Sequence, residues 1–148
     1  MFKRILVTLD GSDLAQQALE PAFEIARKFG GEVILLRVAI AEPQLVALPA
    51  FGEAPLPDYA LQRDREEAEA YLHGLKLEWY SRGAPIHTEI ITGNPAEMIL
   101  DVAEVDEADL IVMSTHGRSG LSRLIYGSVA ESVLRGARAP VLLIPVRK

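Results

Sequence analysis

Three short runs of apolar residues stand out in the pattern of hydrophobic and polar positions along the chain. They lie at residues 5–9, 33–36 and 110–113, and they do not alternate regularly between apolar and polar side chains. Continuous apolar runs of about four to eight residues are typical of parallel strands that are covered by helices on both faces. The pattern therefore predicts three central strands of a parallel sheet.

Two further strands are expected at the edges of this sheet. Residues 86–91 alternate more than the other runs and carry the charged Glu89, which suits a strand with one neighbour only. Residues 140–146 are apolar but contain Pro140 and Pro145. Proline cannot donate a ladder hydrogen bond, so this run is predicted at the other edge.

Helical patterns separate the predicted strands. Ser12 is expected to cap a helix that ends at Gly30-Gly31, because serine is common at the first helical cap and glycine just past the last turn. Residues 58–81 repeat apolar positions at helical spacing and predict the next helix. Residues 41–57 contain four prolines and little periodicity, so an irregular surface loop or a lid is expected there.

The two remaining helices flank the fourth strand. Asn94-Pro95 is predicted to open a helix that runs to about Val105, because asparagine caps helices and proline fits their first position. Another helix is predicted over Val129–Arg135. Right-handed connections then predict one doubly wound α/β domain over residues 1–148, with helices on both faces and the strand order 3-2-1-4-5.

Sheets of this order bind ligands where the connections depart to opposite faces, at the carboxyl ends of the first and fourth strands. Those ends carry Asp10 and residues 114–117, Ser-Thr-His-Gly. Asp10 has a second interpretation, because aspartate often hydrogen-bonds the backbone in a turn between a strand and a helix. Both interpretations stay open.

Composition narrows the possible functions. A chain of 148 residues with a net charge of −6 can bury a core, but it does not present the basic surface expected of a nucleic-acid-binding protein. No cysteine occurs, so disulfides and thiolate metal sites are not expected, and a cytoplasmic location is favoured. No apolar run has the length of a signal peptide core or a membrane span, so no membrane association is expected.

The loop between residues 114 and 128 has the composition of a phosphate site. Its glycines allow the backbone to approach a ligand closely, and the helix that follows offers N–H groups and a partial positive charge. Arg118 and Arg123 add positive charge. However, Ser128 and Glu131 also form a capping-box pattern, in which serine and glutamate satisfy the helix N-terminus without any ligand. The sequence alone does not decide between these two readings.

The spacing within this loop resembles that of the ATP-binding universal stress proteins, whose pattern is G-x-x-G, nine residues, then G-[S/T]. Gly117 matches the second glycine, and Gly127-Ser128 follows after nine residues, whereas Ser114 replaces the first glycine. The resemblance covers essentially the whole chain, including residues 5–12 at the first strand. The Cβ of Ser114 would narrow the space for a ribose, although its hydroxyl could hydrogen-bond the sugar.

The resemblance implies a bound ATP. Because no His/Asp/Glu cluster in the sequence has metal-cage spacing, any metal is expected to be Mg²⁺ held mainly by the phosphates and water. The apolar edge strand Val141–Val146 predicts a homodimer that pairs these strands, and the resemblance also implies a homodimer. The implied nucleoside contacts are Thr8, Leu9, Asp10, Val38 (to adenine), Met113, Ser114 and His116, and the implied phosphate contacts are Gly117, Gly127, Ser128 and Val129.

The favoured hypothesis is an ATP-binding stress or signalling module, in which the nucleotide biases the conformation and the dimer surface. One alternative is a slow ATP hydrolase, although no Walker pattern or obvious base is present. His116 titrates near neutrality, but the sequence offers it no catalytic partner. Another alternative is an interaction protein of the same fold that binds no nucleotide.

Overall fold

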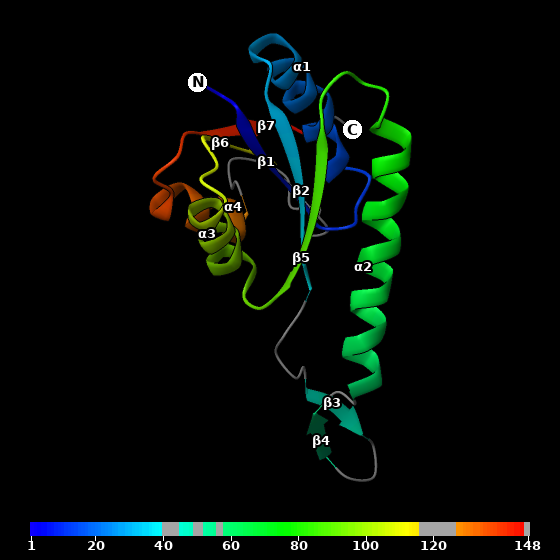
Figure 1. Ribbon diagram of the computed structural model, residues 1–148. Coiled ribbons are helices and arrows are strands. Elements are labelled where there is room, and N and C mark those ends of the chain that lie inside the picture. The colour runs from blue at the N-terminus through cyan, green and yellow to red at the C-terminus, as the bar shows by residue number, and fades with distance from the viewer. Residues whose placement is uncertain (40–44, 49–51, 56–57, 116–126, 147–148) are drawn as a thin grey trace.

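Five parallel strands form the centre of the computed structural model, which describes residues 1–39, 45–48, 52–55, 58–115 and 127–146 (Figure 1). The strands are β1 (Arg4–Leu9), β2 (Glu32–Ala39), β5 (Ile86–Thr92), β6 (Leu110–Ser114) and β7 (Val141–Ile144). They lie in the order β5-β2-β1-β6-β7. This confirms the predicted order 3-2-1-4-5 and the two predicted edge strands.

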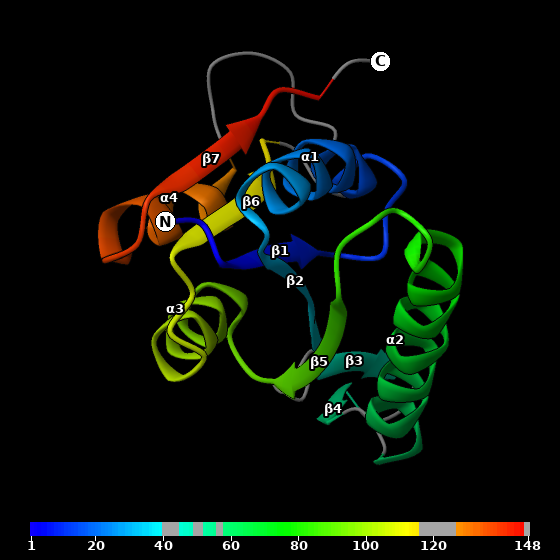
Figure 2. The same ribbon diagram turned by 45° about the horizontal axis from the view of Figure 1, so that its top comes forward.

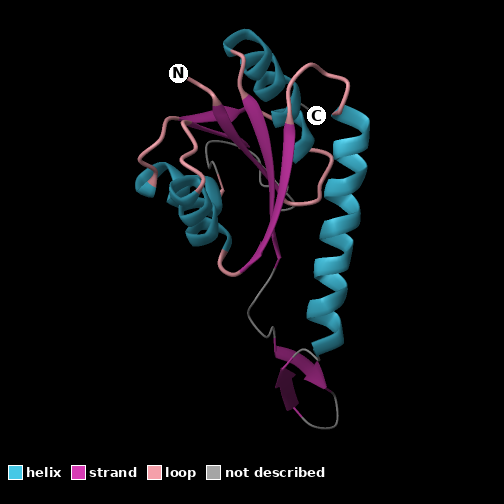
Figure 3. Cartoon of the chain, viewed as in Figure 1, coloured by secondary structure: helices cyan, strands magenta, loops and turns pink. Residues whose placement is uncertain are grey.

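Two pairs of helices cover the two faces of the sheet (Figures 1 and 2). One face carries α1 (Leu19–Phe29) and α2 (Asp58–Trp79), and the other carries α3 (Pro95–Val105) and α4 (Ser128–Gly136). A buried hydrophobic cluster lies under each pair. In the first cluster the rings of Phe23 and Trp79 lie 4.9 Å apart. The layers are visible in Figure 3 as helices on both sides of the strands.

The helix predicted after Ser12 begins differently from the expectation. A short 3₁₀ helix, η1 (Ala15–Ala18), comes first, and α1 begins only at Leu19. Pro21 explains the delay, because its missing N–H and its ring are tolerated only within the first turn of an α-helix. Ser12 is thus not the cap of α1: the N-cap residue of η1 is Leu14, and the Oγ of Ser12 accepts the N–H of Ala15, the first residue of η1, at 3.2 Å. At the other end, Gly30 has the left-handed φ of 64° expected of a C-terminal cap.

The prediction of a wholly irregular loop over residues 41–57 was wrong. Two antiparallel strands, β3 (Leu45–Leu48) and β4 (Gly52–Pro55), form a hairpin in this segment, and Figure 1 shows it near the first turn of α2. Pro55 is compatible with a strand here because both strands of a two-stranded sheet are edges, so a proline can avoid a ladder bond. The rest of this segment lies outside the described residues.

Glu89 in the edge strand β5 lies beside Asp106, at the C-terminal end of α3. Burial raises the pKa of Glu89 above its usual 4.5, and the negative charge of Asp106 and a hydrogen bond with it raise that pKa further. The folded protein therefore holds the Glu89 proton more tightly than the unfolded chain does. The contribution of protonated Glu89 to stability is therefore fully present below the pKa of Glu89 in the unfolded chain. It is lost as the pH rises through the pKa of Glu89 in the folded protein.

Glu89→Gln is accordingly expected to increase the free energy of unfolding at pH 7 by a few tenths of a kcal/mol, a small effect because the site is partly exposed to solvent. At about pH 4, where free glutamate is largely protonated, the gain should disappear. Urea unfolding of both proteins at the two pH values measures it. Glu24→Gln, at an exposed position, serves as the control. A change in the free energy of unfolding by Glu89→Gln that is the same at both pH values would contradict a raised pKa of Glu89.

Candidate functional site

The strands β1 and β6 separate before either of them ends. Their ladder begins with Ile5 opposite Leu110 and ends at Val7 opposite Val112. Beyond this pair, β1 continues to Leu9 beside β2 alone, and β6 continues to Ser114 beside β7 alone. Within the described strands, residues 8–9 and 113–114 are therefore not joined across the sheet. This separation lies at the topological switch point, where sheets of this order bind ligands.

Side chains around the switch point divide between the two faces of the sheet. Met113 belongs to the cluster under α3 and α4, and Val38 packs against the same cluster. Thr8 lies on this face too, because it is two residues from Leu6 and side chains alternate along a strand. Ser114 alternates with Met113 and so lies on the opposite face. Its Cβ therefore does not share the face of Thr8 and Val38.

Two of the predicted site residues have side chains in the hydrophobic core. Leu9 is only 5% exposed and lies in the cluster under α1 and α2, and Met113 is only 4% exposed. A ligand at the switch point could reach these residues through their main-chain atoms only. The sequence could not reveal this, because an apolar residue at a strand end can face either the core or a ligand.

Asp10 organises the turn that follows β1. Its Oδ1 accepts the N–H of Ser12 at 2.9 Å and the hydroxyl of Ser12 at 2.5 Å. The turn-forming role that the sequence left open is thus present, and the half-buried carboxylate still lies at the switch point. Tyr71 of α2, a neighbour of this turn, was not predicted from the sequence. Burial raises the pKa of Tyr71, and the negative charge of Asp10 contributes in the same direction.

A second neighbour, Arg37, was also missed. It lies opposite Leu9 in the β1–β2 ladder, and its positive charge lowers the pKa of Tyr71, which burial raises overall. A charged residue inside the otherwise apolar run of β2 was the signal that could have identified it. Arg37 and Tyr71 belong to the α1/α2 side of the switch point, across the sheet from Val38.

The N-terminus of α4 is capped by glycine rather than by serine. Gly127 is the N-cap residue, with φ 77° and ψ 152° and no side-chain cap, and its carbonyl accepts the N–H of Glu131 at 3.1 Å. Glycine adopts this backbone conformation readily, and other residues do so only with strain. Ser128 is the first residue inside the helix and is exposed.

The capping-box interpretation of Ser128 and Glu131 was therefore wrong. A capping box needs a glutamate three residues after the cap, but with Gly127 as cap that position is Ala130. The carboxylate of Glu131 instead accepts a hydrogen bond from Arg135 Nη2 at 2.6 Å. The first-turn N–H groups of α4 therefore do not donate to a capping box. A helix N-terminus with free N–H groups and a partial positive charge is suited to bind an anion.

This helix terminus lies close to Thr115, the residue that follows β6. A Cβ built on Gly127 would lie 3.6 Å from the Thr115 carbonyl oxygen. Thr115 is itself fixed to the strand at the edge: its N–H donates to Ile144 at 3.0 Å, and its Oγ1 accepts the N–H of Val146 at 3.4 Å. Val129 is half-buried against the cluster under α3 and α4. The helix N-terminus and the separated strand ends therefore share one region.

Some predicted features lie outside the described residues. These are His116, Gly117, Arg118 and Arg123, so their roles remain predictions. Across the residues that are described, His, Asp and Glu side chains form no group of three or more that could hold a metal ion. Among the described helices, none is long and apolar enough to span a membrane.

Comparisons with known proteins all point to one family. The sequence profile of the universal stress protein family matches residues 1–145. Universal stress protein MJ0531 of Methanocaldococcus jannaschii is 40% identical over 144 residues, which are 97% of this chain and 82% of that protein.

Two solved structures are similar to this chain over nearly their full length. Protein MJ0577, from the same organism, superimposes with a TM-score of 0.84 at 30% identity and covers 100% of this chain and 99% of its own. The universal stress protein of Archaeoglobus fulgidus in complex with dAMP has a TM-score of 0.69 at 26% identity and covers 97% of this chain and 99% of its own.

Proposed function

Because the chain belongs to the universal stress protein family, we propose that it is an ATP-binding module of stress response or signalling. The main support is the start of α4, where Gly127 leaves the helix without a side-chain cap beside the strand ends at the switch point. The relative that was solved with dAMP supports an adenine nucleotide as ligand. The lack of cysteine is compatible with a location in the reducing cytoplasm.

The proposed ligand contacts come from the N-terminus of α4 and from the carboxyl ends of the strands. Phosphate oxygens would accept hydrogen bonds from the first turn of α4, and Mg²⁺ would be held mainly by the phosphates and water. The nucleoside would lie toward the strand ends, where Leu9 and Met113 can offer main-chain atoms only. The proposed nucleoside contacts are Thr8, Leu9, Asp10, Val38, Met113, Ser114 and His116, and the proposed phosphate contacts are Gly117, Gly127, Ser128 and Val129.

Analysis of small molecules retained on purification separates this proposal from an interaction protein that binds no nucleotide. We expect mass spectrometry of the denatured protein to detect an adenine nucleotide in the released material. The same preparation of a Gly127→Val variant should release much less. If nothing is released and added ATP does not bind, the nucleotide-free alternative is preferred.

We further propose a homodimer that pairs the β7 strands of two chains. Strand β7 is the edge of the sheet, and all four of its residues, Val141–Ile144, are half-buried in the isolated chain. Pairing across a two-fold axis would cover both the free ladder edge and this apolar surface. Sedimentation equilibrium should give twice the mass of one chain, and a chain that stays monomeric at high concentration would contradict the dimer.

Bound ATP should be hydrolysed very slowly or not at all. Fast phosphoryl transfer needs an oriented water or acceptor as well as charge neutralisation, and the Asp10 carboxylate is engaged by Ser12 in the turn. Phosphate release should therefore be slow under saturating ATP, and Asp10→Ala should not reduce it selectively. Turnover of about 1 s⁻¹ or faster, abolished by Asp10→Ala but not by the neighbouring Asp13→Ala while ATP still binds, would contradict a binding module.

A further inference from the structure

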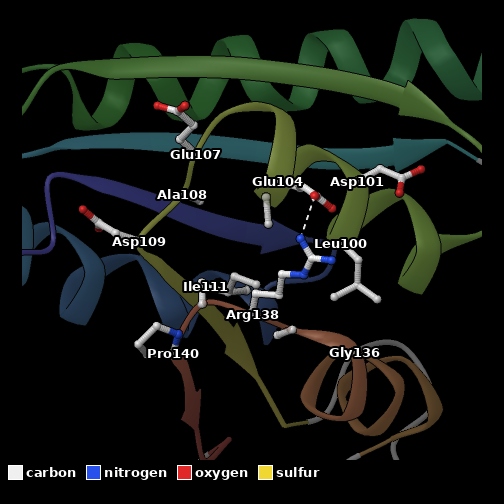
Figure 4. Close-up of a pocket in the computed structure, with 13 residues that line it drawn as sticks. Leu100, Asp101, Glu104, Glu107, Ala108, Asp109, Ile111, Gly136, Arg138 and Pro140 are labelled. Carbon is white, nitrogen blue, oxygen red and sulfur yellow. Dashed lines mark hydrogen bonds and ion pairs between the residues drawn. The ribbon is translucent and has the colours of Figure 1, made fainter.

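A hollow lies between the C-terminal ends of α3 and α4, at the amino ends of β6 and β7 (Figure 4). Its volume is about 430 Å³, which is within the range of ligand pockets. Small or apolar side chains line its base, among them Leu100, Ala108, Ala137 and Ala139. The proposed nucleotide contacts lie at the opposite, carboxyl ends of the strands, so this hollow is a separate feature.

The rim of this hollow is acidic. Asp101, Glu104 and Glu107 are exposed there, and Arg138 is the basic residue in its lining. Within the part of the chain that the structure describes, Asp101 and Glu107 form no ion pair. The C-terminal ends of α3 and α4 add partial negative charge. The hollow therefore combines an apolar base with a negative rim.

Arg138 shows how a long cationic side chain can occupy this place. Figure 4 shows it extending across the hollow toward Glu104, where its Nη1 lies 2.9 Å from Glu104 Oε1. The two side chains are 86% and 67% exposed, and exposed ion pairs contribute little to stability. A cation from another molecule could therefore replace Arg138 at Glu104 at small cost.

We propose that this hollow docks a segment of a partner protein that presents arginine or lysine next to an apolar side chain. The apolar side chain would contact Leu100 and Ala137, and the cation would meet Glu104 and Glu107. Long basic side chains suit such a place because their aliphatic stems lie on apolar surface while their charge stays at the rim. This goes beyond the proposed nucleotide binding, and the test uses the full chain without nucleotide, so failure of one proposal does not imply failure of the other.

The test is an NMR titration with three capped hexapeptides: Gly-Leu-Arg-Ala-Arg-Gly, its glutamate version Gly-Leu-Glu-Ala-Glu-Gly, and its serine version Gly-Ser-Arg-Ser-Arg-Gly. The first should shift the amide signals of Ala103, Ala108 and Ile111 in a saturable way. The serine version should bind several-fold more weakly, and the glutamate version should cause no shift. Absence of shifts with the first peptide, or equal shifts with all three, would overturn the proposal.

Charge variants separate docking from general attraction to an acidic protein. Glu104→Gln combined with Glu107→Gln should weaken the first peptide about three- to fivefold, as expected for the loss of two exposed ionic contacts. Glu24→Gln combined with Glu78→Gln changes the net charge equally at exposed positions of α1 and α2, and it should leave the affinity unchanged. Equal weakening by both pairs would overturn the proposal.

Discussion

Replacement of Gly127 by valine is expected to lower the affinity for ATP about tenfold or more. Gly127 has a φ of 77°, a conformation that costs other residues about 1–3 kcal/mol. Valine would move the backbone away from this conformation and with it the first N–H groups of α4. Because we propose that these groups bind phosphate, binding should weaken by about the same free energy, which corresponds to roughly one order of magnitude or more.

The matched control for this variant is Gly74→Val. Gly74 lies on the exposed side of α2, and a Cβ built there has no neighbour within 4 Å. Valine at this position changes helix propensity but does not touch the switch point, so ATP affinity should be unchanged. Circular dichroism of both variants checks that they are folded. A folded Gly127→Val protein with unaltered ATP affinity would contradict the proposed phosphate contact.

Gly31→Ala should reduce the free energy of unfolding by about 3 kcal/mol, the upper part of the usual range for overpacking. A Cβ on Gly31 would lie 2.6 Å from the carbonyl oxygen of Phe2 and 2.8 Å from that of Lys3. This backbone cannot easily retreat, because the Lys3 carbonyl accepts the Glu32 N–H at 2.8 Å and the Lys3 N–H donates to Asp109 at 2.8 Å. Urea unfolding of the variant measures the loss.

Gly74→Ala provides the comparison for this prediction, because the same methyl group is added where space is open. Alanine is the better helix former by about 1 kcal/mol, so this variant should be more stable than the parent protein. The two alanine variants should thus change stability in opposite directions. A Gly31→Ala protein as stable as the parent would show that the packing of Gly31 against Phe2 and Lys3, just before β1, is described incorrectly.

The sequence predicted the sheet well because several independent signals agreed there. The apolar runs identified the central strands, Pro140 and Pro145 placed the last strand at an edge, and Gly30 marked the end of α1. The 3₁₀ turn before α1 was not predicted, because it depends on Pro21 lying in the first turn of α1. The hairpin over residues 45–55 was missed because its strands are short and prolines surround them.

The separation of β1 and β6 was predictable from the strand order, but the details of the region around it were not. Topology placed it at the ends of β1 and β6, where the ladder between these strands does end early. The start of α4 depended on the φ of Gly127, which no side-chain pattern reveals, so the serine cap was assigned one residue too late. Burial of Leu9 and Met113 likewise depends on which face of the sheet each side chain meets.

Calorimetric titration of the full chain with ATP and Mg²⁺ tests the central proposal most directly. We expect saturable heat with one nucleotide per chain, weakened in Gly127→Val and retained in Gly74→Val. ATP at roughly 100 times its dissociation constant should also stabilise the fold by about 2.7 kcal/mol and raise the melting temperature. No heat and no thermal shift at millimolar ATP would contradict the proposal that the chain is an ATP-binding module.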